Sequence, residues 1–367
     1  MTTPTGWRSV PLSALVDVLD NQRIPLSASE RRHREGTVPY YGATGRVGTI
    51  DKPLFDEPLI LLGEDGVQFF DPYKPKAYKI AGPSWVNNHA HVLRPKTGVI
   101  EFGYLLHYLN AFDYQGYANG TTRLKLTQGA MKSIPVNLPP LDKQRQIVET
   151  LDEHLSRLDN ALAEFSNARA SLMLFERAIL HDAFSSAAVD SEMVDFKEFF
   201  NVLQPRFEGY KQKDYQVEGK LPIIDQGNAL IGGYVNEMTR RIEVERPLIV
   251  FGDHTRCVKY VDFHFAMGAD GTKLLEPRAP VDPWFAYWQL RGTNLRNRGY
   301  ARHMGELRKA RFWLPGSSAQ NEINQKVERA FESTNQLRSQ LEAQEMAVDV
   351  LRRALLHAAF SGNLGSM

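Results

Sequence analysis

Residues 177–185 read Arg-Ala-Ile-Leu-His-Asp-Ala-Phe-Ser, and residues 353–361 read Arg-Ala-Leu-Leu-His-Ala-Ala-Phe-Ser, which is almost the same stretch again. Seven of the nine positions are identical, at an offset of 176 residues. The same offset pairs Gln144 with Gln320 and Ile147 with Ile323. A repeat with so long a period indicates two copies of one structural unit.

Weaker copies of the repeat lie upstream of these stretches. The segment 58–63 (Pro-Leu-Ile-Leu-Leu-Gly) resembles the segment 247–252 (Pro-Leu-Ile-Val-Phe-Gly), and the segment 38–45 parallels 221–227. Each copy therefore consists of a variable globular part followed by a more uniform tail.

The two tails, residues 141–190 and 317–367, are predicted to be long helices. Their apolar residues recur at steps of three, four or seven, which is the narrow seam of a coiled coil. The seam comprises Ile147, Leu151, Leu155, Leu158, Leu162, Phe165 and Phe175 in the first tail, and Ile323, Val327, Leu337, Leu341, Val348 and Leu351 in the second. Helices of about 43 residues would each be ~65 Å long. We expect them to pair antiparallel, and Ser317 with Gln320 to form a capping box at the start of the second.

The globular parts, residues 1–140 and 191–316, alternate short apolar runs with turn residues, a pattern typical of strands. Strands are expected at 59–62, 91–93, 134–136, 248–251 and 273–275, and short helices at 102–109 and 284–290. The predicted fold class is α/β. Two mixed α/β domains are separated by two long antiparallel coiled-coil helices, with a pseudo-twofold internal repeat.

The composition is ordinary for a globular protein, with 24% charged and 43% hydrophobic residues and a net charge of +1. The charge is unevenly distributed. The first globular part holds 15 basic and 12 acidic residues, and the second holds 19 basic and 16 acidic residues. The first tail holds 5 basic and 9 acidic residues, and the second holds 5 basic and 6 acidic residues. If the partner is DNA, the globular parts should face it. The sequence contains neither a signal peptide nor an apolar run of membrane-spanning length, so we expect a cytoplasmic protein.

The junction of globular part and tail carries a resemblance to a known family. The run 134–147, Ile-Pro-Val-Asn-Leu-Pro-Pro-Leu-Asp-Lys-Gln-Arg-Gln-Ile, leads into a long helix that ends in Ala-Phe-Ser at residue 185. This resembles the junction between target-recognition domain and conserved helix in specificity subunits of type I restriction-modification systems. The segments 7–12 and 41–48 resemble the start of such a recognition domain. The second copy departs from this pattern, because Leu-Pro-Gly-Ser-Ser-Ala-Gln at 314–320 replaces the Pro-Pro-Leu entry.

The resemblance implies a non-catalytic subunit that reads a bipartite site on double-stranded DNA. Residues 1–140 and 191–316 would be target-recognition domains 1 and 2, and residues 141–190 and 317–367 would be conserved spacer helices that set the distance between half-sites. Two methyltransferase subunits and the restriction subunits would be the partners. The chain itself would need no cofactor, since S-adenosylmethionine is expected in the methyltransferase subunit.

The richest candidate for DNA contact is the basic segment 291–311 of the second copy. Arginine is suited to guanine edges and to phosphates, and the segment contains one acid, Glu306. Its candidate residues are Arg291, Arg296, Arg298, Tyr300, Arg302, His303 and Arg308. The alternative is a solvated helix face.

In the first copy, three shorter segments are candidates for DNA contact. The matching region contributes Thr121, Thr122, Arg123 and Lys125, the glycine-rich loop contributes Thr44 and Arg46, and an amide pair contributes Asn87 and Asn88. Amides suit adenine, but glycine-rich loops and Asn-Asn pairs are also common turn chemistry. Both interpretations of the last two segments stay open.

No catalytic constellation is recognisable in the sequence. Phosphate-binding loops and paired cofactor motifs are missing, and one cysteine, Cys257, excludes a multi-cysteine zinc site. His89 and His91 lack a neighbouring acid in sequence, so we expect structural roles and no metal. The main alternative function is a coiled-coil protein-interaction scaffold without DNA specificity. It predicts no salt-sensitive affinity for DNA, whereas phosphate contacts make affinity fall steeply with salt.

Overall fold

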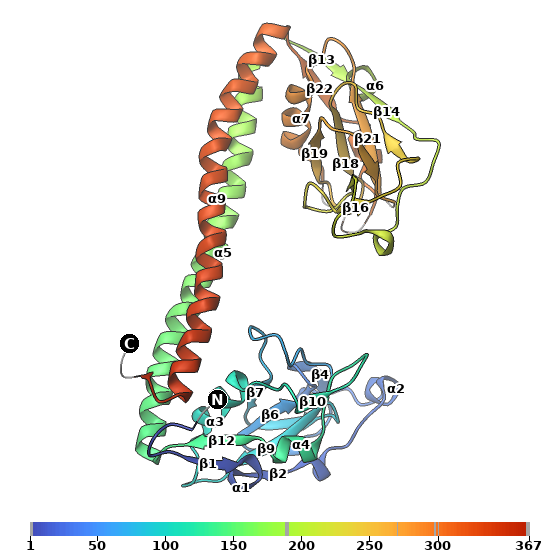
Figure 1. Ribbon diagram of the computed structural model, residues 1–367. Coiled ribbons are helices and arrows are strands. Elements are labelled where there is room, and N and C mark those ends of the chain that lie inside the picture. The colour runs from blue at the N-terminus through green and yellow to red at the C-terminus, as the bar shows by residue number, and fades with distance from the viewer. Residues whose placement is uncertain (1–2, 188–190, 270, 297–298, 300, 365–367) are drawn as a thin grey trace. The chain divides into compact units, whose positions relative to one another are not determined.

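The computed structural model describes residues 3–187, 191–269, 271–296, 299 and 301–364 (Figure 1). The chain forms two compact units. Unit 1 comprises Met1–Ser166 and Glu342–Met367, and unit 2 comprises Asn167–Leu341. Both long helices contribute one part to each unit.

Unit 1 is built on two four-stranded sheets, with strand orders β2-β9-β6-β7 and β4-β3-β8-β5, and on the pairs β1-β12 and β10-β11. Its strands are β1 (Arg8–Pro11), β2 (Val16–Val18), β3 (Val38–Tyr41), β4 (Arg46–Ile50), β5 (Phe55–Asp56), β6 (Leu59–Gly63), β7 (Ala77–Ile80), β8 (Pro83–Val86), β9 (Ala90–Pro95), β10 (Ala118–Asn119), β11 (Lys125–Leu126) and β12 (Pro135–Leu138). Its short helices are α1 (Leu12–Leu15), η1 (Asp20–Gln22), α2 (Ala28–Arg32), α3 (Phe102–Ala111) and α4 (Gln128–Lys132).

Unit 2 repeats the two four-stranded sheets and the β1-β12 pair of unit 1. Its two four-stranded sheets have the orders β14-β21-β18-β19 and β16-β15-β20-β17, and β13 pairs with β22. The strands are β13 (Glu192–Asp195), β14 (Phe200–Leu203), β15 (Leu221–Ile224), β16 (Gly233–Val235), β17 (Arg241–Ile242), β18 (Leu248–Gly252), β19 (Val258–Val261), β20 (Phe265–Met267), β21 (Thr272–Pro277) and β22 (Arg311–Leu314). The helices are α6 (Phe196–Phe199), η3 (Gln212–Asp214), α7 (Pro283–Gly292) and α8 (Met304–Leu307).

The buried strands form where the sequence is continuously apolar. Every residue of β6 and of β18 is buried, as expected for a central strand covered on both faces. Each pairs antiparallel with the equivalent neighbours, β7 and β9 in unit 1 and β19 and β21 in unit 2. The predicted strands and short helices are confirmed, and so is the α/β fold class with its internal repeat.

The two long helices are α5 (Leu141–Ala187) and α9 (Ser317–Phe360), and within each unit they pack antiparallel (Figure 1). In unit 1 the beginning of α5 shares a core with the end of α9, where Ile147 and Leu151 lie with Phe360. In unit 2 the end of α5 meets the beginning of α9, where Leu180 lies with Val327. The predicted antiparallel pairing is therefore present in both units.

Fewer of the predicted seam residues are buried than their spacing in the sequence suggested. The predicted members Leu337 and Leu351 are 50% and 56% exposed, and Phe175 is 58% exposed. Glu176 is buried instead, because its carboxylate is held by Arg291 and Arg338. The other predicted members are buried or half-buried: Ile147, Leu151, Leu155, Leu158, Leu162, Phe165, Ile323, Val327, Leu341 and Val348.

The capping box expected at the start of α9 is not formed. Gln320 does not turn back to Ser317. Its Oε1 accepts a hydrogen bond from the backbone N–H of Asp282 at 2.7 Å, and its Nε2 donates to Pro315 O at 2.8 Å. The glutamine therefore anchors α9 to α7. Among the described residues, none of the helices combines the length and the apolar character needed to cross a membrane.

Candidate DNA interface

Four chain segments of unit 1 meet beyond the ends of β3, β6 and β8. The turn after β3 closes through a hydrogen bond from Gly42 N to Gly45 O of 2.8 Å. Past the end of β6, the backbone of Glu64 binds two other segments. Its N–H donates to His89 O at 2.8 Å, and its carbonyl accepts from Leu126 N at 2.7 Å. Asn87 N donates to Tyr41 O at 3.0 Å, which joins the 87–89 turn to the end of β3. The glycine-rich loop, the 64–65 turn, the 87–89 turn and the 119–125 loop therefore lie at one edge of the unit.

Side chains connect three of these segments through Asp65. Its Oδ1 lies 2.6 Å from Arg123 Nη2 and 2.9 Å from His89 Nδ1. Beside it, Lys125 Nζ lies 3.0 Å from Glu64 Oε1. The two basic residues of the 119–125 loop are therefore oriented by acids that follow β6 directly.

Most of the predicted residues of unit 1 are exposed at this edge, namely Thr44, Arg46, Asn88, Thr121, Thr122, Arg123 and Lys125. Asn87 differs, because it is half-buried and its Oδ1 accepts a hydrogen bond from His89 N at 2.8 Å. Its side chain therefore serves the turn, which was one of the two interpretations of the amide pair.

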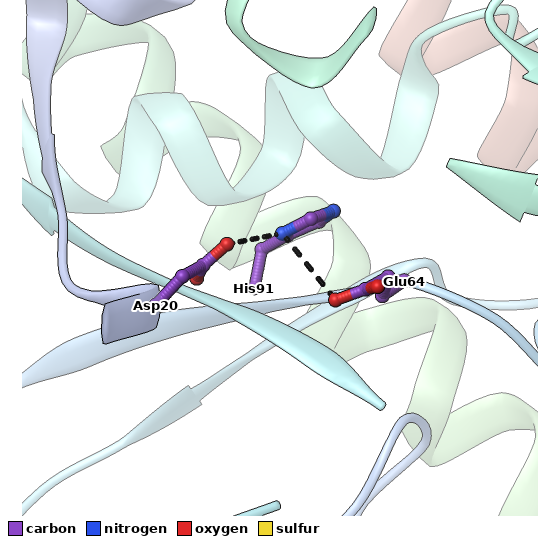
Figure 2. A group of neighbouring side chains, drawn as sticks. All are labelled: Asp20, Glu64 and His91. Atoms are coloured by element: carbon purple, nitrogen blue, oxygen red, sulfur yellow. Dashed lines mark hydrogen bonds and ion pairs between the residues drawn. The ribbon is translucent and has the colours of Figure 1, made fainter. Parts of the chain in front are cut away.

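Behind this edge, the buried side chains of Asp20 and His91 lie beside the half-buried Glu64, as Figure 2 shows. His91 Nδ1 lies 2.6 Å from Asp20 Oδ2 and 3.9 Å from Glu64 Oε2, and its Nε2 lies 2.8 Å from Leu126 O. The acids that the sequence did not place near this histidine thus come from segments far along the chain. Burial disfavours the charged form of Asp20, but hydrogen bonds from His91 and Val92 N outweigh it and lower the pKa of the carboxyl.

This group resembles a metal site in composition, but its hydrogen bonds explain its geometry. Both ring nitrogens of His91 have oxygen partners within the unit, Asp20 Oδ2 and Leu126 O. The arrangement instead ties the start of the 125–128 segment to the sheet, since Gln128 Nε2 also donates to Asp20 Oδ2 at 3.1 Å.

In unit 2 the structure corrects the prediction for Arg291. This residue lies in α7, and its guanidinium donates to Glu176 at 3.3 Å and to Tyr287 OH at 3.1 Å. It also lies over the ring of Phe331, 4.7 Å from its centre. Arg291 therefore joins α7 to the long helices. The sequence could not show this, because Glu176 precedes it by 115 residues.

The prediction for His303 is also corrected. This side chain is fully buried, and its Nδ1 lies 2.9 Å from Asp253 O. The backbone N–H groups of His303 and Met304 both donate to Asp253 Oδ1, at 2.9 and 2.7 Å. His303 therefore anchors the basic segment to the end of β18 and presents no surface to a ligand.

The remaining candidates of unit 2 divide into two groups. Arg296, Arg302 and Arg308 are exposed. Arg298 and Tyr300 lie outside the described residues.

The residues that organise these edges were missed in the sequence. Asp65 and Asp253 lie one or two positions beyond an apolar strand, and polar residues at a strand end were the available signal. Their partners could not be found in the same way, because Asp65 is 58 residues from Arg123 and Asp253 is 50 from His303.

The first part of the chain is similar to a known protein family. Residues 4–164 match the family described as type I restriction modification DNA specificity domain. A Haemophilus influenzae protein that carries the name of a type I restriction enzyme specificity subunit is 32% identical over 40% of this chain and 36% of its own length. The type I restriction enzyme EcoDI specificity subunit of Escherichia coli is 25% identical over 48% of this chain and 37% of its own length.

The chain spans about a third to a half of the length of the curated relatives it matches. A solved structure described as "Structural basis underlying complex assembly and conformational transition of the type I R-M system" contains a chain with the same fold. Its TM-score is 0.70 at 14% identity, over 99% of this chain and 100% of that one. The resemblance noted in the sequence is confirmed.

Proposed function

Because residues 4–164 belong to the type I restriction modification DNA specificity domain family, we propose that this chain reads a bipartite site on double-stranded DNA. Unit 1 would recognise one half-site and unit 2 the other. The observation that carries this proposal is the identical strand order of the two units, with a basic loop at the equivalent edge of each. Two copies of one recognition domain suit a DNA site that consists of two separate halves.

The edge of unit 1 has the chemistry that DNA recognition needs. Arg123 and Lys125 carry the charge, while Thr44, Asn88 and Thr121 supply neutral donors and acceptors. Arg123 is 60% exposed despite its pairing with Asp65, and an ion pair so exposed contributes little to stability. Its guanidinium can therefore exchange this partner for a base edge or a phosphate at small cost.

The long helices have features that suit docking to partner proteins. Leu174 and Phe175 are 65% and 58% exposed on α5, and Val350 and Leu351, exactly one repeat later, are 57% and 56% exposed on α9. Exposed apolar residues on a helix are typical of interaction sites. Two equivalent patches suit two copies of one partner, which supports a pair of methyltransferase subunits that bring S-adenosylmethionine, with restriction subunits joining them.

The proposal also assigns roles along the chain. Residues 1–140 and 191–316 act as target-recognition domains 1 and 2. Residues 141–190 and 317–367 act as spacer helices that set how many unread base pairs separate the half-sites. Access to the chromosome requires the cytoplasm as the place of action.

Methylome sequencing after co-expression with the cognate methyltransferase subunit tests this proposal. We expect a bipartite methylated motif in the host DNA. Exchange of residues 1–140 for those of a relative should change one half of the motif, and exchange of residues 191–316 should change the other half only. A stable complex that leaves no methylated motif would contradict DNA reading and favour a protein-binding scaffold.

A further inference from the structure

The turns that follow β6 and β18 are equivalent in detail. Glu64 N donates to His89 O at 2.8 Å, and Asp253 N donates to Gly271 O at 2.7 Å. Glu64 O accepts from Leu126 N at 2.7 Å, and Asp253 O accepts from His303 N at 2.8 Å. Each turn is therefore fixed between the same two neighbouring segments, one of which is the basic loop of its unit.

In unit 1 the arginine at this junction comes from the loop. Arg123 reaches back to the turn, where its Nη2 lies 2.6 Å from Asp65 Oδ1. The guanidinium lies directly over Gly66, where an added Cβ would come within 2.8 Å of Nη2. Gly66 also has a positive φ of 71°. This turn therefore needs glycine for its backbone, and the guanidinium of Arg123 packs against it.

In unit 2 the arginine at the same junction comes from the turn itself. Arg256 N donates to Gly252 O at 2.7 Å, which closes the turn between β18 and β19. From there its Nη1 donates to Leu295 O at 3.1 Å, in the basic segment 291–311 that also contains His303. The guanidinium thus bridges turn and loop, as Arg123 does from the opposite side.

The backbone of Arg256 is in a conformation that arginine disfavours. Its φ is +63°, and of the non-glycine residues that the structure describes, it is the one with a positive φ. Glycine adopts this left-handed conformation without steric cost. Of the ten described glycines with positive φ, five lie at these recognition edges or loops, namely Gly45, Gly66, Gly120, Gly271 and Gly299. Residues with a strained backbone are common at functional sites, where the surrounding structure holds the strained conformation because the side chain has a role there. The side chain of Arg256 is therefore the feature to explain.

We propose that Arg256 is the counterpart of Arg123 and reads a base in the half-site recognised by unit 2. This rests on the proposed function. A guanidinium presents five N–H donors, and one bond to Leu295 O orients the group while leaving others for a bidentate contact with guanine O6 and N7. Arg256 takes over the role that the sequence favoured for Arg291 and His303, which the structure assigns to packing.

The test is methylome sequencing of hosts that co-express the methyltransferase subunit with the full chain, its Arg256→Gly variant or its Arg256→Lys variant. Glycine relieves the backbone strain and removes the contact, whereas lysine keeps the charge and loses the bidentate geometry. Both variants should relax one base pair of a single half-site, with about 5- to 150-fold less discrimination there. The other half-site should stay unchanged, and the melting temperature of the Arg256→Gly complex should not fall.

Each other outcome has a definite meaning. An unchanged motif in both variants overturns the proposal and leaves Arg256 a turn residue. An equal loss of methylation at all sites, with the motif unchanged, also overturns base reading and indicates a phosphate contact. If the unaltered chain yields no bipartite motif, the proposed function itself fails, and the assignment of Arg256 fails with it.

Discussion

Gln144 and Gln320 make the same pair of hydrogen bonds in the two units. Gln144 Oε1 accepts from Glu101 N at 2.8 Å, and Gln320 Oε1 accepts from Asp282 N at 2.7 Å. Each Nε2 donates to the carbonyl of the proline five residues earlier, at 2.9 and 2.8 Å. Glu101 and Asp282 are the N-cap residues of α3 and α7. Each buried glutamine therefore fastens the start of a long helix to the start of the short helix that packs on the sheet.

Replacement of either glutamine by leucine should destabilise the unit that contains it. Gln144→Leu leaves Glu101 N and Pro139 O without their partner in a buried place, which costs about 1–3 kcal/mol per unsatisfied group. Gln320→Leu should cost a similar amount. Thermal unfolding of the purified variants measures the effect. Gln146→Leu and Gln325→Leu are matched controls because both side chains are exposed, and they should change stability by less than about 0.5 kcal/mol.

Asp20 should make the stability of unit 1 depend on pH in the acid range. Its folded pKa is lowered from 3.8, because hydrogen bonds from His91 and Val92 N outweigh the effect of burial. The carboxylate therefore stabilises the folded state fully above the unfolded pKa, and this contribution is lost as the pH falls through the lower folded value.

Comparison of the wild type with Asp20→Asn checks this prediction. The difference in melting temperature should be largest near neutral pH and should shrink below about pH 4. Asp142→Asn is the control, because this side chain is 90% exposed and should show little difference at any pH. If the difference in melting temperature between the two proteins stays constant down to pH 3, Asp20 stabilises unit 1 through its packing and not through its charge.

Local patterns in the sequence were enough to predict the elements of the fold. The apolar runs at 59–62 and 248–251 became the central strands β6 and β18, and the repeat at 177–185 and 353–361 predicted two equivalent helices. Burial on the helices was predicted less well, since Phe175 and Leu351 fit the seam by spacing but are exposed. Spacing fixes which residues share a face, but it does not show how far the partner helix covers that face.

The candidate interface was predictable in composition and only partly in detail. The basic loops were recognisable because Arg123 and Arg302 lie in segments rich in donors and glycine. The role of Arg291 depends on Glu176, and that of His303 on Asp253, residues that lie far apart in the sequence. Arg256 carried no sequence signal, since a left-handed backbone at an arginine is visible only in the structure.

Arg123→Ala should relax recognition of one half-site while leaving the other unchanged. Arg123 is exposed and is oriented by Asp65, so its loss would remove the proposed contact to DNA without disturbing the core. Loss of one base contact reduces discrimination at that position by about 1–3 kcal/mol. Methylome sequencing reads out both half-sites in one experiment. Arg157→Ala is the control, since this arginine pairs with Glu153 on the exposed face of α5 and should leave the motif intact.

Arg302→Ala should weaken DNA binding by the assembled complex through loss of a phosphate contact. Arg302 is exposed next to the anchored His303, so the buried histidine fixes its backbone while its side chain faces solvent. Each phosphate contact releases about one counterion. The slope of log affinity against log salt should therefore become less steep by about 1, with a similar loss on specific and non-specific DNA. Lys309→Ala, at another exposed position of the same segment, tests whether the effect belongs to Arg302 or to the net charge of the segment. Unchanged affinity, specificity and salt slope would remove Arg302 from the interface and leave Arg256, in the turn after β18, as the proposed DNA contact of unit 2.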